Sequence, residues 1–351
     1  MGESAASARW GPTVNAFLKA HAQHVRRGRA VWPTIFSRSS LALAWCVAVA
    51  CQTGPQFTDG LRKVSGADLG VTYSLAVVGD LAYVTDNQGL TILDVRNPER
   101  PTRLGSLAIG EASFGVAVRA GVAYVSSGDG GLVIADVTDS RTPAILGRLN
   151  DGGVGTRLWI EGSHVYLADE RDGLEIVDVS DLRNPVKVGQ LPGGGRGRAV
   201  VVDGDVAFLA DPARGVLVVD VSDPARPTIV TAVPGTSSAW ALHRHEDRLY
   251  VGRHGAGVVL LDISDPVSPQ VMGSYFDGGE AQGVWGNGTL LFVADNEDGV
   301  EVLDISDPGH VTKIASYSQG RAAHDLVSDG TMVYVATAGE GFVLLEFRSS
   351  S

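Results

Sequence analysis

The sequence predicts an all-β protein, a seven-bladed β-propeller of four-stranded antiparallel blades. Three observations predict it. A unit recurs every 42 residues, each unit contains short apolar runs separated by turn residues, and the apolar residues within a unit do not have helical periodicity. The period is marked by an acidic residue after an apolar run, at Asp94, Asp136, Asp178, Asp220, Asp262, Asp304 and Glu346. Seven such positions indicate seven blades.

Residues 198–231 show the four strands of one unit, which we name A to D. The apolar runs predict strands at 198–202, 206–209, 216–221 and 228–231. Gly204 and Asp205 are typical of a tight hairpin between A and B. Proline recurs just before strand D, and because it lacks an amide hydrogen it suits an outer edge strand. These prolines are Pro101, Pro143, Pro185, Pro227 and Pro269.

Two repeated positions favour structure over chemistry, because seven equivalent catalytic sites are implausible. We expect each acidic residue to accept backbone hydrogen bonds in the C–D turn. A glycine stands five residues before each one, and we expect it to adopt a positive φ or to form a bulge entering strand C. The glycines are Gly89, Gly131, Gly173, Gly215, Gly257, Gly299 and Gly341.

The seventh unit lacks a strand D of its own, because only five residues follow Glu346. A β-rich segment at about 61–66, LRKVSG, has the right phase to supply that strand. We therefore expect it to pair beside Phe342–Phe347 and to close the ring, which protects the sheet edges.

The units resemble the LVIVD repeat family. The motifs that carry the resemblance are GLTILDVRNPERP, GLEIVDVSDLRNP, GVLVVDVSDPARP and GVEVLDISDPGHV, and it covers nearly all of 61–348. The resemblance implies a propeller in exported bacterial or archaeal surface proteins. It implies no settled biochemical activity.

Residues 1–51 differ in kind and are predicted to be a leader. Arginines at 26, 27, 29 and 38 precede the apolar run 41–50, which is followed by Cys51. A basic region, a short apolar core and small residues are typical of a secretory signal. The end of this leader, together with Cys51, resembles the lipobox of bacterial lipoproteins. The resemblance implies cleavage before Cys51 and attachment of lipid to Cys51. We expect export to the cell envelope or outer surface, with 52–60 as linker and 61–351 as propeller. A membrane anchor without cleavage and an ordinary apolar terminus are the alternatives.

Charge and cysteine usage restrict the partners. The chain has 28 basic and 40 acidic residues; without residues 1–50 it has 22 and 39, a net charge of −17. Such a domain repels phosphate backbones, so we expect no nucleic acid partner, and membrane contact only through the N-terminal lipid. Both cysteines, Cys46 and Cys51, lie in the leader, which leaves the propeller without disulfides or cysteine metal ligands.

The first residue of strand A should lie at the mouth of the central channel, and it differs in every blade. Two positions later the residues are uniformly apolar: Leu75, Val116, Leu158, Val200, Leu242, Val284 and Leu326. We predict a ligand-binding surface from the variable column, because aromatic and arginine side chains dominate recognition sites. With the next position included, the candidates are Tyr73, Phe114, Arg157, Arg198, Trp240, Gln282, His324 and Asp325. Arg157, Arg196 and Arg198 could together recognise a carboxylate or phosphate group.

No catalytic residue, metal site or cofactor is predicted. Acidic residues of the B–C loops suggest calcium, but ordinary hairpin turns explain them better and the loops lack the twelve-residue calcium pattern. They are Asp169, Asp172, Asp295, Glu297 and Asp298. His243 and His245 share a strand face, yet spacing supplies no third metal ligand. Glycine-rich residues 193–198 form a D–A loop and not a phosphate-binding turn.

These observations favour a monomeric, non-catalytic module of the cell envelope that binds a protein, peptide or glycan partner at the channel mouth. An envelope hydrolase or lyase using the same face is one alternative, and a purely structural surface component is another. The fold cannot decide between them, because propellers host both binding and catalysis.

Overall fold

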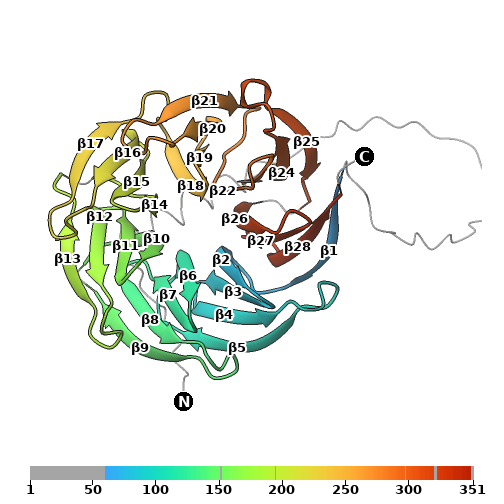
Figure 1. The fold of residues 1–351 in the computed structure, drawn as a ribbon. Helices are drawn as coiled ribbons and strands as arrows, with labels where there is room; N and C mark the ends of the chain where they lie inside the picture. The colour runs from blue at the N-terminus through green and yellow to red at the C-terminus, as the bar shows by residue number, and fades with distance from the viewer. Residues whose placement is uncertain (1–59, 151, 194, 297, 320–321, 349–351) are drawn as a thin grey trace, which may run out of the picture. The chain divides into compact units, whose positions relative to one another are not determined.

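The computed structural model describes residues 60–348, except 151, 194, 297 and 320–321. Its strands form seven four-stranded antiparallel sheets, arranged as blades around a central channel (Figure 1). Within blades 1 to 6 the strands follow one another outward in chain order, so strand A lines the channel and strand D lies on the rim. The fold class predicted from the sequence is confirmed.

The blades follow one another along the chain. Blade 1 consists of β2 (Thr72–Val78), β3 (Leu81–Asp86), β4 (Gly89–Asp94) and β5 (Thr102–Ala108). Blade 2 consists of β6 (Gly115–Arg119), β7 (Val122–Ser126), β8 (Leu132–Asp136) and β9 (Ala144–Leu149). Blade 3 consists of β10 (Gly155–Glu161), β11 (His164–Asp169), β12 (Gly173–Asp178) and β13 (Val186–Gln190). Blade 4 consists of β14 (Ala199–Asp203), β15 (Val206–Asp211), β16 (Gly215–Asp220) and β17 (Thr228–Ala232). Blade 5 consists of β18 (Ala239–His245), β19 (Arg248–Arg253), β20 (Gly257–Asp262) and β21 (Gln270–Tyr275). Blade 6 consists of β22 (Gly283–Gly286), β23 (Leu290–Asp295), β24 (Gly299–Asp304) and β25 (Thr312–Tyr317), with a 3-10 turn η1 (Pro308–His310) before β25.

Blade 7 is built from both ends of the described chain. It joins β26 (Ala323–Ser328), β27 (Met332–Thr337) and β28 (Gly341–Phe347) to β1 (Leu61–Ala67) as its outer strand. The pairing is antiparallel and runs from Leu61 opposite Phe347 to Ala67 opposite Phe342. The predicted ring closure is therefore confirmed, and Leu61 is fully buried at the junction.

The two repeated positions have the structural roles expected of them. In blades 1 to 6 the acidic side chain accepts the N–H of the residue two positions later, as Asp220 does from Ser222 at 2.9 Å. The glycine entering strand C has a positive φ in every blade. A side chain there would clash with the neighbouring strand, since a Cβ on Gly257 would overlap the carbonyl oxygen of Tyr275, the last residue of the neighbouring strand D. Each strand D also begins directly after its proline, where one is present.

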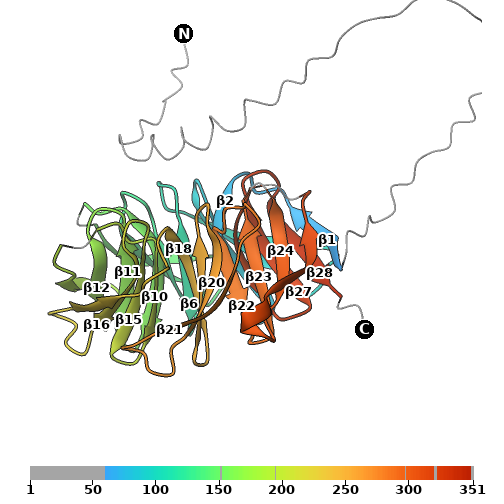
Figure 2. The same cartoon turned by 90° about the horizontal axis from the view of Figure 1, so that it is seen from above.

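The apolar core is divided into seven clusters, and each one fills the space between two neighbouring blades. The uniformly apolar column of strand A contributes one residue to each cluster; Leu75, for example, packs between blades 7 and 1. Figure 2 shows the strands running between the two faces of the ring. One face carries the A–B and C–D turns, and the other carries the D–A and B–C loops, which surround the channel mouth.

Candidate functional site

The variable column lies at the start of strand A, where the chain enters each blade from the mouth face. Strand A is irregular here in blades 1, 3, 5 and 7, because its register against strand B shifts at this point. Tyr73, Gln282 and His324 are buried, whereas Phe114 and Trp240 are half-buried. The side chains of this column pack closely on one another, which the sequence did not predict.

An aromatic cluster occupies the mouth over blades 7, 1 and 2. The ring of Tyr73 stacks on His324 at 5.7 Å and meets Phe114 edge-on at 4.9 Å. The Tyr73 hydroxyl donates to Oδ1 of Asn87 at 2.8 Å, and Nδ1 of His324 donates to the carbonyl of Thr72 at 2.8 Å. Burial raises the pKa of Tyr73 to about 12, and the nearby Asp86 acts in the same direction. The tyrosine is thus a neutral hydrogen-bond donor at physiological pH.

A chain of charged and aromatic contacts occupies the mouth over blades 3 to 6. Arg198 forms an ion pair with Glu170, and its guanidinium lies 4.0 Å from the centre of the Trp240 ring. Trp240 packs on His254 at 4.9 Å, and His254 approaches Glu280 at 3.4 Å. Burial lowers the pKa of Arg198, while Glu170 opposes that effect. Arginine over tryptophan is a favourable cation–π arrangement, so Arg198 holds the indole in place.

An ion pair crosses the channel between blades 3 and 7. Arg157 on β10 donates from Nη1 to Oδ2 of Asp325 on β26, and its Nη2 donates to the carbonyl of His324 at 3.2 Å. Oδ2 of Asp325 also accepts from Oγ of Ser74 at 2.7 Å. Three blades are thereby joined at the centre of the ring.

This arrangement revises the expected arginine cluster. Arg157 and Arg198 each have a carboxylate of the protein as a partner, and only Arg196 is exposed. A carboxylate or phosphate ligand would have to displace Asp325 or Glu170 to engage both of the paired guanidinium groups. Among the described residues, the buried Nε2 of Gln282 and the buried Nε of Arg198 have no hydrogen-bond acceptor.

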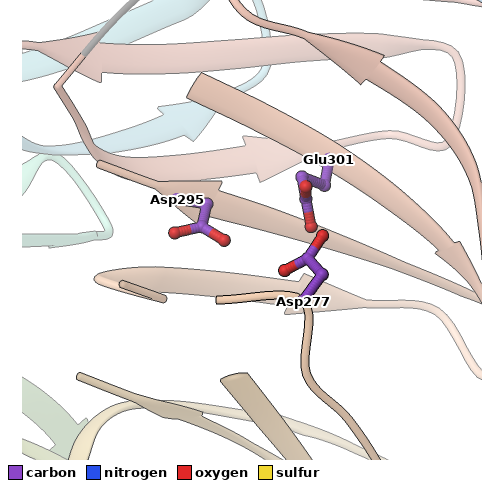
Figure 3. A group of neighbouring side chains, drawn as sticks. All are labelled: Asp277, Asp295 and Glu301. Carbon is purple, nitrogen blue, oxygen red and sulfur yellow. The ribbon is translucent and has the colours of Figure 1, made fainter. Parts of the chain in front are cut away.

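The structure brings together an acidic group that the sequence did not predict. One carboxylate oxygen from each of Asp277, Asp295 and Glu301 lies within 4.8 Å of the others, at the mouth-face end of the space between blades 5 and 6 (Figure 3). Nζ of Lys313 on β25 lies 2.6 Å from Asp277 and 2.8 Å from Glu301. Burial raises the pKa of Asp295 to about 6 and that of Glu301 to about 7. Of the three, only Asp295 is among the acidic B–C loop residues named from the sequence.

A signal for this group was present in the sequence. Glu301 occupies a strand-C column that is apolar in four other blades, at Val133, Leu217, Val259 and Val343. Blade 3 carries the same exception, with Glu175 paired to Lys187 at 3.0 Å as Glu301 is to Lys313. A buried charge in an apolar column is costly and therefore informative.

The leader prediction (1–51), the lipidation prediction (Cys51) and the linker prediction (52–60) fall outside the described residues, except for Gly60 at the end of the linker. Among the residues that are described, no helix has the length and apolar character needed to cross a bilayer.

Comparison with solved structures supports the fold alone. The chain is similar to the β-propeller domain of Myceliophteria thermophila Cps50 (Swd1), with a TM-score of 0.69 and 11% identity over 82% of this chain and 100% of that one. It is also similar to the computationally designed Ika8 protein, with a TM-score of 0.61 and 12% identity over 81% of this chain and 98% of that one. No curated protein matches the sequence.

The sequence profile of the LVIVD repeat matches six consecutive stretches that together span more than half of the chain. They are 69–108, 110–151, 152–191, 194–234, 238–277 and 278–319. The seventh blade follows these matches and is completed by β1. The chain belongs to the LVIVD repeat family.

Proposed function

We propose that this protein is a non-catalytic binding module of the cell envelope that holds a protein, peptide or glycan partner at the channel mouth. One observation carries the proposal. The mouth position has a different side chain in every blade, whereas the residue two positions along is apolar in all seven and packs between blades. A position free to vary on a constant scaffold is where binding specificity resides.

Phe114 and Trp240 are the residues best placed to contact a partner. Both are half-buried, so each presents part of an aromatic face, and Arg198 and His254 hold the indole of Trp240. A rigid aromatic side chain loses little entropy on binding and suits a sugar ring or an apolar peptide side chain equally.

The two ion pairs at the centre of the mouth favour binding over catalysis by these residues. Arg157 with Asp325, and Arg198 with Glu170, neutralise each other within the protein. A general acid or base must be able to exchange a proton with a substrate, which such pairs do not favour. The proposal therefore gives these four residues a positioning role.

Envelope location is the second part of the proposal. It is supported by the basic region, the apolar run 41–50 and Cys51, in the order of a lipoprotein signal. Metabolic labelling with a radioactive fatty acid tests it: label on the wild-type chain and none on Cys51→Ala is expected, and equal label on both would contradict it.

The binding proposal is tested by retention from an envelope extract of the source cells. Immobilised wild-type protein, Trp240→Ala and Phe114→Ala are compared, and we expect each variant to retain at least about tenfold less, as for loss of a central aromatic contact. Phe276→Ala is the matched control, because Phe276 is a 60% exposed aromatic beyond strand D, away from the channel. Thermal melts confirm that all variants fold.

Treating the extract beforehand identifies the partner class. Protease should abolish retention of a protein or peptide, and periodate should abolish retention of a glycan. Retention that survives both mouth substitutions but is lost in Phe276→Ala would move the site to the rim and contradict the proposal.

A further inference from the structure

The last residue of strand B is an aspartate in four blades, at Asp86, Asp169, Asp211 and Asp295. In blades 1, 3 and 4 its carboxylate accepts N–H groups of its own B–C loop at 2.7–3.0 Å, which fixes the loop. Blade 5 has Arg253 at this position. A guanidinium accepts no hydrogen bond, so the charge and the hydrogen-bonding role of the position are both reversed in this blade.

The guanidinium of Arg253 is only partly satisfied within the protein. Its Nη1 donates to the carbonyl of Gly235 at 3.2 Å, and its Nη2 donates to the carbonyl of Ala256. Among the described residues no carboxylate forms an ion pair with Arg253, and its buried Nε has no acceptor. Burial lowers the pKa of Arg253. A half-buried cation without a counter-charge is costly, and groups of this kind cluster at functional sites.

Arg253 lies at the same end of blade 5 as Trp240. It pairs across β18 and β19 with Ala239, the residue before Trp240, and the next residue, His254, packs on the indole at 4.9 Å. The guanidinium of Arg198 lies 4.0 Å from the centre of the same ring. Two arginines are therefore neighbours of the half-buried indole, and within the described part of the chain only Arg198 is neutralised by a carboxylate.

These groups restrict the chemistry of a ligand. Because guanidinium groups only donate, the ligand group that they bind must accept, and a carboxylate matches the planar fork of an arginine. Without residues 1–50 the chain has 22 basic and 39 acidic residues, a net charge of −17, which repels polymers that bear many anionic groups. A single carboxylate on an otherwise neutral or basic chain avoids that repulsion, and the C-terminus of a peptide is such a group.

We propose that Arg253 binds the C-terminal carboxylate of a peptide partner at the channel mouth, while the last side chain of that peptide packs on the indole of Trp240. This inference rests on the proposed binding function and names the partner class within it. The last residue of a peptide bears its carboxylate and its side chain on one carbon atom, so both contacts can form at once. C-terminal carboxylates are a recurring recognition element in peptide binding.

The test uses the immobilised full chain and two pools of acetylated tetrapeptides that lack Asp and Glu. One pool ends in a free carboxylate, and the other has the same sequences ending in an amide. Mass spectrometry measures the retained peptides, and we expect at least about tenfold more of the acid pool, as for one charged hydrogen-bonded contact. Arg253→Gln should remove this preference. Arg226→Gln is the matched control, because the side chain of Arg226 is 84% exposed on a C–D turn, and it should leave the preference unchanged.

A second variant protects the test against a folding defect. Arg253→Asp restores the residue of blade 4 in a B–C loop of the same length, from Asp211 to Gly215 and from Arg253 to Gly257. An aspartate there can accept the N–H groups of its loop, so we expect a melting temperature within about 2 °C of the wild type. The same aspartate repels a carboxylate, so this variant should retain fewer acid than amide peptides.

Equal retention of the two pools by the wild type would overturn the inference, and so would a preference for the acid pool that both Arg253 variants leave intact. Retention from the envelope extract that depends on Trp240 and is abolished by periodate would leave the proposed function standing with a glycan partner. That result would exclude the peptide terminus as its ligand. Retention of nothing from the extract and of neither pool would contradict the binding function itself.

Discussion

On the face that carries the C–D turns, six aspartates occupy one repeated position, and each accepts a backbone N–H at 2.8–3.0 Å. On the mouth face, the carboxylates of Asp325, Glu170 and Asp295 have partners that differ from blade to blade. On the first face, each of the six aspartates supplies the same thing, an acceptor for a backbone N–H of its own turn. On the second face these three carboxylates have partners from other blades or loops, an arrangement that agrees with the binding role proposed for the mouth.

The largest effect should come from removing the strand that holds both faces in one ring. Deleting residues 57–66 removes most of β1 and leaves β28 without its outer partner. The loss of the buried Leu61 and of several backbone hydrogen bonds should cost more than about 5 kcal/mol. The melting temperature should then fall by more than about 10 °C, as measured by calorimetry. A chain that lacks only residues 1–50 is the control, and an unchanged melt of the longer deletion would show that closure does not stabilise the ring.

A smaller effect is expected from pH, and it has opposite signs on the two faces. Hydrogen bonds lower the pKa values of turn aspartates such as Asp220 below 3.8, so their contribution to stability is present above that pH and lost in acid. Burial raises the pKa of Glu301 from 4.5 to about 7 and that of Asp295 from 3.8 to about 6. Stability from these two groups is therefore complete below about pH 4 and is lost as the pH rises through 6 to 7.

Melting temperatures measured between pH 2.5 and 8 in EDTA should fall in two ranges: an acid limb at low pH and a second limb as the pH rises above about 4.5. The decline from pH 4.5 to 7.5 should amount to about 3 kcal/mol, or about 6 °C. Glu301→Gln should flatten this limb and leave the acid limb unchanged. A decline that persists in both Glu301→Gln and Asp295→Asn would assign it to other groups.

The repeat explains why so much of the scaffold could be predicted and so little of the mouth. A 42-residue period places equivalent residues in equivalent environments, so the turn aspartates, the glycine with positive φ and the strand at 61–66 could be inferred from spacing. Arg157 and Asp325 are 168 residues apart and belong to blades that are not neighbours. Their contact depends on side-chain reach across the channel, which no spacing encodes. Three arginines near one opening predicted an anion site, and the structure shows two of them already paired.

The acidic group shows a different limit. Asp277, Asp295 and Glu301 come from a D–A loop, the end of strand B and strand C, so they occupy three separate columns of the repeat. Each column compared by itself shows only an unusual residue. Asp277 comes from the loop after blade 5 and the other two from blade 6, so their proximity could be seen only in three dimensions.

The smallest predicted effect concerns the ion pair at the centre of the mouth face. It is tested by making the same change, aspartate to asparagine, once on each face. Asp325→Asn leaves Arg157 without its carboxylate, and because the two side chains are 10% and 24% exposed we expect a loss of about 2 kcal/mol, or about 4 °C. Asp220→Asn keeps an acceptor for the N–H of Ser222 and should change stability by less than about 0.5 kcal/mol.

The double variant Arg157→Met with Asp325→Asn separates the pair from its parts. Removing both charges should recover part of the loss seen in Asp325→Asn, because no guanidinium is then left in the channel without a counter-charge. Urea unfolding of the wild type, both single variants and the double variant gives the coupling energy directly. Additive losses would show that Arg157 and Asp325 contribute independently to stability. The carboxylate of Asp325 would then resemble those of the turn face, each of which accepts hydrogen bonds from its own loop and does not depend on other blades.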